Sequence, residues 1–147
     1  MPEAWRFAPP SEADFEPLLT LCIEVMREHL ERVFRYEPSR ARRVFRESFD
    51  EPGLRLIVLG EERVGCVGFR IGESEIKLDS FYLANHLHNG GMGTRILKVL
   101  LDEADTLGLP IRLEVLRGSP ADRFYLRHGF VKIGEDDIEA EFERAVR

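Results

Sequence analysis

The sequence predicts one mixed α/β domain of the α+β type: a mostly antiparallel sheet of about seven strands, with a central parallel βαβ unit and helices on both faces. Three apolar runs separated by short glycine-containing turns are typical of an antiparallel meander. A helical segment between the third run and the next strand indicates a right-handed parallel crossover. The length of 147 residues suits a single domain, residues 1–147.

Proline positions, a helix-capping pattern and the spacing of apolar residues predict the first strand and the first helix. A short strand is expected at residues 5–8, ended by Pro9 and Pro10. Ser11 is the predicted helix cap, with Asp14 in the capping-box position. Apolar residues at three- and four-residue steps then form one buried stripe. The stripe comprises Phe15, Leu18, Leu19, Cys22, Val25, Met26, Leu30 and Val33.

The remaining elements alternate along the chain. An arginine-rich helix from Pro38 to about Phe49 is stopped by Pro52 and Gly53. A crossover helix begins after residues 91–93 and ends at Gly108, and a further helix runs from Ser119, its predicted cap, to residue 128. The expected strands are residues 54–59, 64–71, 75–83, 111–115, 130–133 and 138–142.

Composition excludes several classes of protein. Apolar residues make up 44% of the chain, which is too many for a disordered polymer. The net charge of −6 disfavours general nucleic-acid binding, and no apolar run approaches the roughly 20 residues that span a membrane. Cys22 and Cys66 have no metal or redox spacing, so no metal site is expected. With no recognisable secretion signal at the N-terminus, we expect a cytoplasmic protein.

The strongest chemical signal is a glycine-rich turn between a predicted strand and a predicted helix. It reads His88, Asn89, Gly90, Gly91, Met92, Gly93 and Thr94. Glycine and asparagine tolerate left-handed backbone angles, and N–H groups at a helix start bind anions. The turn lacks the lysine of a Walker motif and the spacing of a dinucleotide fingerprint. It is therefore predicted to bind a pyrophosphate, with a plain tight connection as the alternative.

The turn resembles the Gln/Arg-x-x-Gly-x-Gly/Ala motif of the GNAT superfamily of acetyl-CoA-dependent N-acetyltransferases. Residues 113–130, which include Phe124 and Tyr125 and end in Gly129-Phe130, resemble the second motif of that family. Two positions depart from the pattern: His88 replaces Gln or Arg, and Ser119 replaces a frequent Asn. The resemblance covers the element order of the whole chain and implies a GNAT-like fold.

The resemblance also implies where acetyl-CoA lies. The fourth and fifth strands would splay apart, and the pantetheine arm would pair with backbone groups of Phe81, Tyr82 and Leu83. The thioester would lie beside the helix that starts at Ser119. The N–H of Tyr82 or Leu83 would stabilise the oxyanion.

Three side chains are predicted to take part in the chemistry. Tyr125 occupies the family's tyrosine position and would protonate or stabilise the leaving thiolate, with Phe124 facing the core and Tyr125 the cleft. Glu75 and Asp79 are candidate bases, because residues 75, 77, 79 and 81 would share one strand face. Water and His86 are alternatives, whereas His29 and His128 are expected at helix surfaces or ends.

The acceptor is expected to be a primary amine of a small molecule or peptide. If arginines of the first two helices line the cleft, they would favour an acceptor with a carboxylate or phosphate. These are Arg27, Arg32, Arg35, Arg40, Arg42, Arg43 and Arg46. The alternatives are a catalytically weak acyl-CoA sensor or docking module and a nucleotide-binding switch. The resemblance also allows a homodimer.

Overall fold

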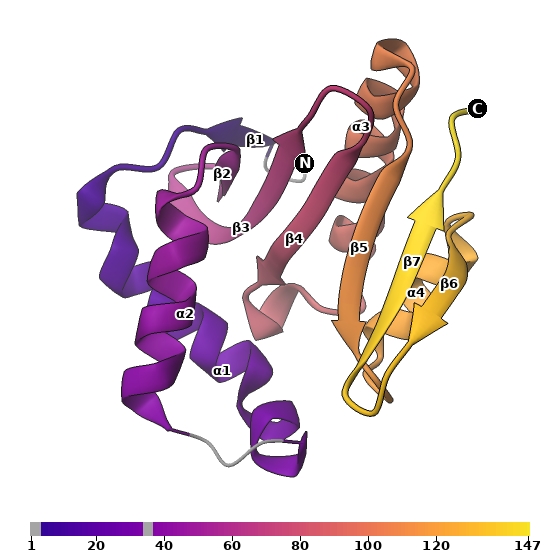
Figure 1. The fold of residues 1–147 in the computed structure, drawn as a ribbon. Coiled ribbons are helices and arrows are strands. Elements are labelled where there is room, and N and C mark those ends of the chain that lie inside the picture. The colour runs from indigo at the N-terminus through magenta and orange to yellow at the C-terminus, as the bar shows by residue number, and fades with distance from the viewer. Residues whose placement is uncertain (1–3, 34–36) are drawn as a thin grey trace.

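A seven-stranded sheet of order β1-β2-β3-β4-β5-β7-β6 forms the centre of the structure (Figure 1). The computed structural model describes residues 4–33 and 37–147, and for residues 28–33 the backbone only. The strands are β1 (Trp5–Ala8), β2 (Leu54–Leu59), β3 (Glu62–Ile71), β4 (Ile76–Leu83), β5 (Ile111–Leu116), β6 (Val131–Glu135) and β7 (Glu139–Arg144). The helices are α1 (Phe15–Val33), α2 (Pro38–Asp50), α3 (Met92–Leu107) and α4 (Ala121–Arg127), with short 3₁₀ turns η1 (Glu12–Asp14) and η2 (Asn85–Leu87).

The strand pairing confirms the predicted fold class. Strands β1 to β4 form an antiparallel meander, and β5, β7 and β6 pair antiparallel at the other side of the sheet. Among the described residues, the only parallel pair is β4 with β5, which α3 connects. A parallel pair needs such a crossover because its strands start at the same edge of the sheet.

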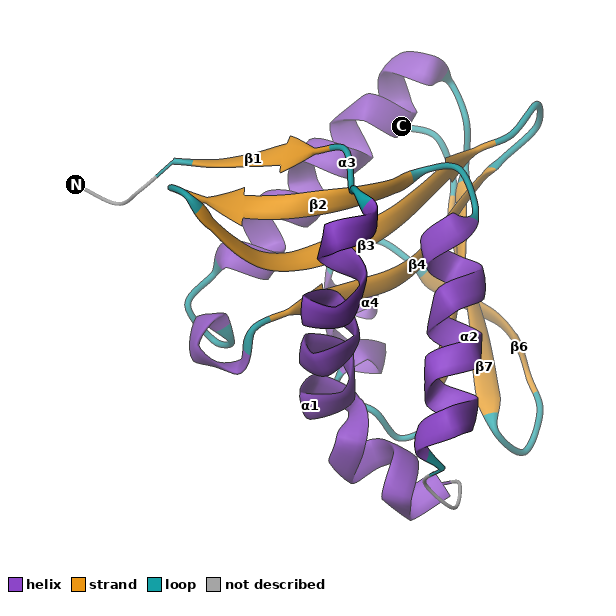
Figure 2. Ribbon diagram, turned by 90° about the vertical axis from the view of Figure 1, so that its left-hand side faces the viewer, coloured by secondary structure: helices purple, strands orange, loops and turns teal. Residues whose placement is uncertain are grey.

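The helices cover the two faces of the sheet unequally. Figure 2 shows α1 and α2 side by side on one face and α3 on the other. The larger core lies between the sheet and α3 and α4, and includes Phe69, Leu97, Leu100 and Phe142. The smaller core joins α1 and α2 to β2 and β3 through Phe15, Phe45, Phe49 and other apolar side chains. Because both faces are covered, central strands such as β3 are buried on both sides.

Most predicted boundaries agree with the structure within one or two residues. The capping box forms, with Ser11 N–H donating to Asp14 Oδ2 at 2.8 Å, although the first turn is 3₁₀. Gly108 ends α3 with a φ of +72°, which a left-handed cap requires. The predicted cap at Ser119 is wrong by one residue: Pro120 is the cap of α4. The side chains of Leu30 and Val33 in the predicted stripe lie outside the described residues.

Candidate active site

The parallel strands β4 and β5 separate shortly after they begin. Their pairing stops at Lys77–Arg112, whereas β5 stays paired with β7 as far as Leu116. Within the described part of the chain, the rest of β4 therefore has no ladder partner in β5. The separation of the fourth and fifth strands, which the family resemblance implied, is present.

A bulge at Ser80 changes which way the last residues of β4 face. Ser80 has a φ of +49°, and the register between β3 and β4 shifts beside it. The extra residue breaks the strict alternation of side chains. As a result, Phe81 packs with the α3 core and Tyr82 with the α1–α2 core. The expectation that Phe81 shares a face with residues 75, 77 and 79 is therefore wrong.

The backbone of β4 beyond the bulge has one side bonded to β3 and one side directed at the gap. Ala84 N–H donates to Val64 O at 2.8 Å. In an antiparallel pair, alternate residues direct their N–H and C=O groups to the same neighbour. The backbone N–H and C=O groups of Tyr82 therefore face β3, while those of Phe81 and Leu83 face the gap between β4 and β5.

Two side chains contact these backbone groups. Cys66 Sγ accepts a hydrogen bond from Tyr82 N–H and lies 3.4 Å from Ser80 O, to which it donates. On the gap side, His88 Nε2 donates to Leu83 O at 2.8 Å, since a carbonyl oxygen can only accept. The first residue of the glycine-rich turn thus holds a backbone group that the resemblance assigns to the pantetheine arm.

The glycine-rich turn has the predicted left-handed residues and leads directly into α3. Asn89 has a φ of +66° and Gly91 one of +82°. Gly91 caps the helix without a side-chain hydrogen bond, and the first intrahelical donor is Arg95 N–H, which reaches Gly91 O at 3.1 Å. The N–H groups of the first helical turn have no intrahelical acceptor. They form the beginning of an anion site at the positive end of the helix dipole.

The side chains within the turn serve different purposes. Met92 is buried in the α3 core, so only its N–H is available to a ligand. Gly93 lies against Leu83 and Phe124, where a Cβ would make ordinary contacts at 3.7 Å. The turn is therefore packed on the end of β4 and on α4, which brings it to the gap.

Tyr125 is more buried than its neighbour Phe124, which reverses the expected order. Tyr125 is 6% exposed, and its ring centroid lies 5.2 Å from those of both Phe124 and Phe130. Phe124 is only partly buried and faces Phe81, with ring centroids 6.3 Å apart. Burial, helped by the negative charge of Asp79, raises the pKa of the Tyr125 phenol. The phenol therefore stays protonated and can donate a hydrogen bond.

The start of α4 carries polar atoms that the protein itself does not satisfy. Among the described residues, Ser119 Oγ and Asp122 Oδ1 are buried without a hydrogen-bond partner. Buried polar atoms are usually paired. Ser119 was predicted to contact the cofactor, whereas no sequence pattern singled out Asp122 beyond its favourable place in a first helical turn.

The two predicted bases have different partners. Glu75 lies just before β4, where β4 and β5 are still paired, and its Oε2 is 3.5 Å from Arg112 Nε. Asp79 lies next to the bulge and accepts hydrogen bonds from Arg70 through both of its oxygens. Four residues of strand separate the two carboxylates by roughly 13 Å along β4. Asp79 is thus the nearer of the two to the gap and the turn.

A second pair of carboxylates lies on the paired strands β5 and β7. Leu113 faces the α3 core, so its neighbour Glu114 projects from the opposite face of β5. Glu114 forms a hydrogen bond with Glu139 of β7, and Figure 1 shows no described helix in front of these strands. This hydrogen bond, together with burial and the charges of Glu114 and Asp136, raises the pKa of Glu139 to about 7.

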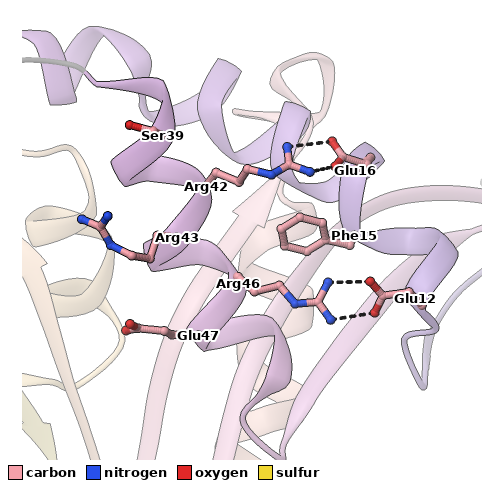
Figure 3. A pocket seen from close by; sticks show the side chains of 8 residues that line it. All are labelled: Glu12, Phe15, Glu16, Ser39, Arg42, Arg43, Arg46 and Glu47. Carbon is pink, nitrogen blue, oxygen red and sulfur yellow. Dashed lines mark hydrogen bonds and ion pairs between the residues drawn. The ribbon is translucent and has the colours of Figure 1, made fainter.

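Two of the arginines of the first two helices, Arg42 and Arg46, are paired with glutamates. A cleft of about 480 Å³ lies between η1, α1 and α2. Figure 3 shows Arg42 facing Glu16 and Arg46 facing Glu12 in its lining. The two Arg46–Glu12 contacts measure 2.6 and 2.7 Å. These pairs offset the local positive charge. Of the other predicted arginines, Arg32 and Arg35 lie outside the described side chains.

The structure also places the remaining histidines and both cysteines. His86 is exposed in η2, and His128 Nδ1 donates to Phe124 O at 2.7 Å at the end of α4. The side chain of His29 lies outside the described residues. Both cysteines are free thiols, and Cys22 is hydrogen-bonded to the Tyr82 hydroxyl. Burial raises the pKa of Cys22 to about 11, so this thiol stays protonated.

Neither a metal cluster nor a membrane-spanning helix is present among the described residues. No group of three or more metal-ligating side chains lies together in the part of the chain that the structure describes. Over the same residues, no helix combines the length and the apolar character that a membrane crossing requires.

A partly buried polar cluster on the α2 side of β4 was not predicted from the sequence. Arg70, Ser48 and Ser80 surround Asp79, and all four are joined by hydrogen bonds. The available signal was Gly65 and Gly68 in the middle of a strand, because interior glycines mark bulges or close approach. A Cβ at Gly65 would overlap Tyr82 O, and one at Gly68 would lie 2.8 Å from Arg70 Nη2.

The chain is similar to known proteins both in its sequence and in its fold. Residues 22–145 match the family described as "Acetyltransferase (GNAT) domain". No curated protein sequence matches the chain. Several solved structures share the fold over nearly the whole length of both chains.

Three of these structures represent the group. A protein of Pyrococcus horikoshii OT3 is 17% identical with a TM-score of 0.78, covering 98% of this chain and 99% of that one. The PaiA N-acetyltransferase of Thermoplasma acidophilum, solved in complex with coenzyme A, is 16% identical with a TM-score of 0.77, covering 97% and 99%. An acetyltransferase of Thermus thermophilus is 19% identical with a TM-score of 0.74, covering 98% and 99%.

Proposed function

Since the chain belongs to the GNAT family of acetyltransferases and takes acetyl-CoA as its co-substrate, we propose that it acetylates a primary amine. The acceptor is a small molecule or a peptide, and the amine attacks the thioester directly within a ternary complex. The observation that carries the proposal is the gap between β4 and β5, which opens beside the left-handed turn at the start of α3.

In the proposed complex, the turn holds the pyrophosphate and the gap holds the pantetheine arm. The pyrophosphate is bound by N–H groups from Asn89 to Thr94, which include those of the first turn of α3. The N–H of His88, also predicted to bind it, already donates to Asn85 O at 3.1 Å. The arm pairs with the gap-facing backbone of Phe81 and Leu83, and His88 releases Leu83 O when the arm binds. Tyr82 contributes through its place between these two residues, and Ser119 supplies its unsatisfied hydroxyl at the start of α4.

Charge develops on two atoms during the transfer. The carbonyl oxygen becomes negative when the amine attacks, and an N–H donor must lie beside it. Of the two predicted donors, Leu83 N–H is supported by its direction into the gap, whereas Tyr82 N–H is directed at Cys66. The sulfur becomes a thiolate when the C–S bond breaks, and the protonated Tyr125 phenol donates a hydrogen bond to it.

The attacking ammonium must first lose a proton, and Glu75, Asp79, His86 and water remain the candidates. The nearness of Asp79 to the bulge favours it over Glu75. Both oxygens of Asp79 already accept hydrogen bonds from Arg70, so a water that relays the proton is consistent with the geometry. The variants Asp79→Asn and Glu75→Gln, each measured over a pH range, distinguish these routes by which one removes the acidic limb of kcat/KM.

The pairing of Arg42 and Arg46 with glutamates weakens the case for an anionic acceptor. Arg42 and Arg46 lose much of their attraction for an anionic acceptor because glutamates already neutralise them. A panel of amino acids, peptides and polyamines, with free thiol release as the readout, identifies the class. A panel in which polyamines are acetylated better than every anionic amine contradicts the anionic preference.

The decisive experiment compares binding with turnover. Acetyl-CoA should raise the melting temperature and ATP should not, and ligand at about 100 times its Kd adds about 2.7 kcal/mol of stability. Thiol release with at least one amine confirms the transferase. Binding without release from any amine would instead support the acyl-CoA sensor, and stabilisation by ATP alone would support the nucleotide switch. The cytoplasmic location and the homodimer stay predictions.

A further inference from the structure

A buried arginine lies at the centre of a hydrogen-bonded cluster beside the β4 bulge. Arg70 of β3 is 9% exposed. Its Nε and Nη2 donate to Asp79 Oδ2 and Oδ1 at 3.2 and 2.9 Å. Its Nη1 donates to Glu51 O at 2.6 Å and Pro52 O at 3.3 Å, and Nη2 also reaches Ser48 O at 3.0 Å. Burial of a charge is costly unless it is paired in this way.

The same cluster connects the end of α2 to the bulge. Ser48 O is one of the last carbonyls of α2, which have no intrahelical donor, and Arg70 supplies one. A cation at this position also suits the negative end of the helix dipole. The Ser48 hydroxyl accepts from Arg70 Nη2 at 2.9 Å and lies 2.6 Å from the Ser80 hydroxyl. Ser80 is the residue with the left-handed φ.

Glycine at position 68 leaves room for this cluster. Gly68 lies directly opposite Asp79 in the β3–β4 register. A Cβ there would lie 2.8 Å from Arg70 Nη2 and closer still to Asp79 Oδ1, so neither side chain could keep its place. The pairing of Arg70 with Asp79 therefore depends on glycine at 68.

Left-handed angles in residues other than glycine persist only where surrounding contacts enforce them. At Ser80, the enforcing contacts come from Asp79 on one side and from Ser48 through the paired hydroxyls. The bulge in turn decides that the backbone of Phe81 and Leu83 faces the gap. Without it, regular alternation would direct the groups of these residues toward β3.

We propose that Arg70 is a positioning residue for acetyl transfer: through Asp79 and the Ser48–Ser80 hydroxyl pair it holds the β4 bulge that aims the Leu83 and Phe81 backbone at the thioester. This inference rests on the proposed function. Arg70 itself does not touch the co-substrate. The turn that binds the pyrophosphate lies beyond the end of β4, so loss of Arg70 should impair catalysis more than cofactor binding.

The chain offers a matched control for the buried arginine. Arg144 of β7 is 5% exposed and forms a two-point pair with Asp105, with nitrogen–oxygen distances of 3.0 and 3.1 Å. This pair joins β7 to α3 and has no contact with the bulge or the turn. Arg70→Lys and Arg144→Lys therefore each remove a planar two-point pair with an aspartate, because lysine carries its charge without the rigid fork.

The experiment measures kcat, KM for acetyl-CoA and the Kd of CoA for both variants at a temperature where both are folded. We expect Arg70→Lys to lower kcat by about 10- to 100-fold, the scale of a misplaced reacting group. Its Kd for CoA should rise by a smaller factor than kcat falls, because the pyrophosphate contacts in the turn remain while the arm loses only part of its backbone pairing. Arg144→Lys should keep the wild-type kcat. Equal losses of kcat in the two variants, or an unchanged kcat in Arg70→Lys, would overturn the proposal.

Amide hydrogen exchange tests the same inference independently of turnover. Exchange at Phe81, Tyr82 and Leu83 should quicken in Arg70→Lys and in the milder Ser48→Ala, but not in Arg144→Lys. Unchanged exchange in both bulge variants would refute the positioning role even if the protein proves to be an active transferase. If no amine is acetylated, the proposed function fails, while quickened exchange would still show that Arg70 holds the bulge.

Discussion

The left-handed residue at the start of α3 allows a test in which the expected cost comes from backbone conformation alone. Gly91 has a φ of +82°, and a Cβ added there would have no heavy atom within 4 Å. Gly91→Ala therefore introduces no clash, only the penalty of a left-handed angle for an L-residue, about 1–2 kcal/mol. For a chain of this length, 1 kcal/mol corresponds to a change of about 2–4 °C in Tm, so we expect a fall of about 2–8 °C.

The neighbouring Gly90 is the matched control. It has no positive φ, and its added Cβ would meet only Leu87 O at 3.7 Å. Gly90→Ala should therefore be neutral or stabilise by about 0.4–1 kcal/mol through the unfolded state. Thermal unfolding of both variants, with and without CoA, is the assay. Equal melting temperatures for the two variants would refute the conformational argument, and undiminished CoA stabilisation of Gly91→Ala would contradict the role of the turn.

Three further predictions concern the gap and its surroundings. Tyr125→Phe should lower kcat about 10- to 100-fold, the worth of one hydrogen bond to a charged sulfur, with the Kd of CoA unchanged; an unaltered kcat would exclude the phenol. Gly68→Ala should cost about 1–3 kcal/mol in urea unfolding through overpacking against Asp79, and a wild-type midpoint would show that the cluster adapts. Glu139 binds more protons when folded, because its pKa is raised to about 7 from 4.5. Its contribution to stability should therefore fall as pH rises through that window, by about 1 kcal/mol after solvent screening. Glu139→Gln should flatten this part of the stability profile, and an identical profile in the variant would show that Glu139 titrates normally.

Local sequence patterns predicted left-handed residues and the capping box correctly, but not the irregularity within β4. Asn89, Gly91 and Gly108 were predicted to end or begin elements in left-handed angles, and they do, because φ preferences belong to each residue and its immediate neighbours. The capping box at Ser11 formed for the same reason. Strand alternation failed at Phe81, since a bulge depends on what the partner strand and the helix above it provide.

By itself, the sequence determined the order of the elements, the crossover between β4 and β5, and the glycine-rich turn. Each of these depends on apolar periodicity, on glycine and proline positions, or on backbone preference within a short stretch of chain. The greater burial of Tyr125 than of Phe124, and the neutralisation of Arg42 and Arg46 by glutamates, follow from the packed structure alone. Packing also brought together Arg70, Asp79, Ser48 and Ser80 from three elements. Such contacts join segments far apart in sequence, and their geometry is set by the packing of whole elements, which no local pattern records.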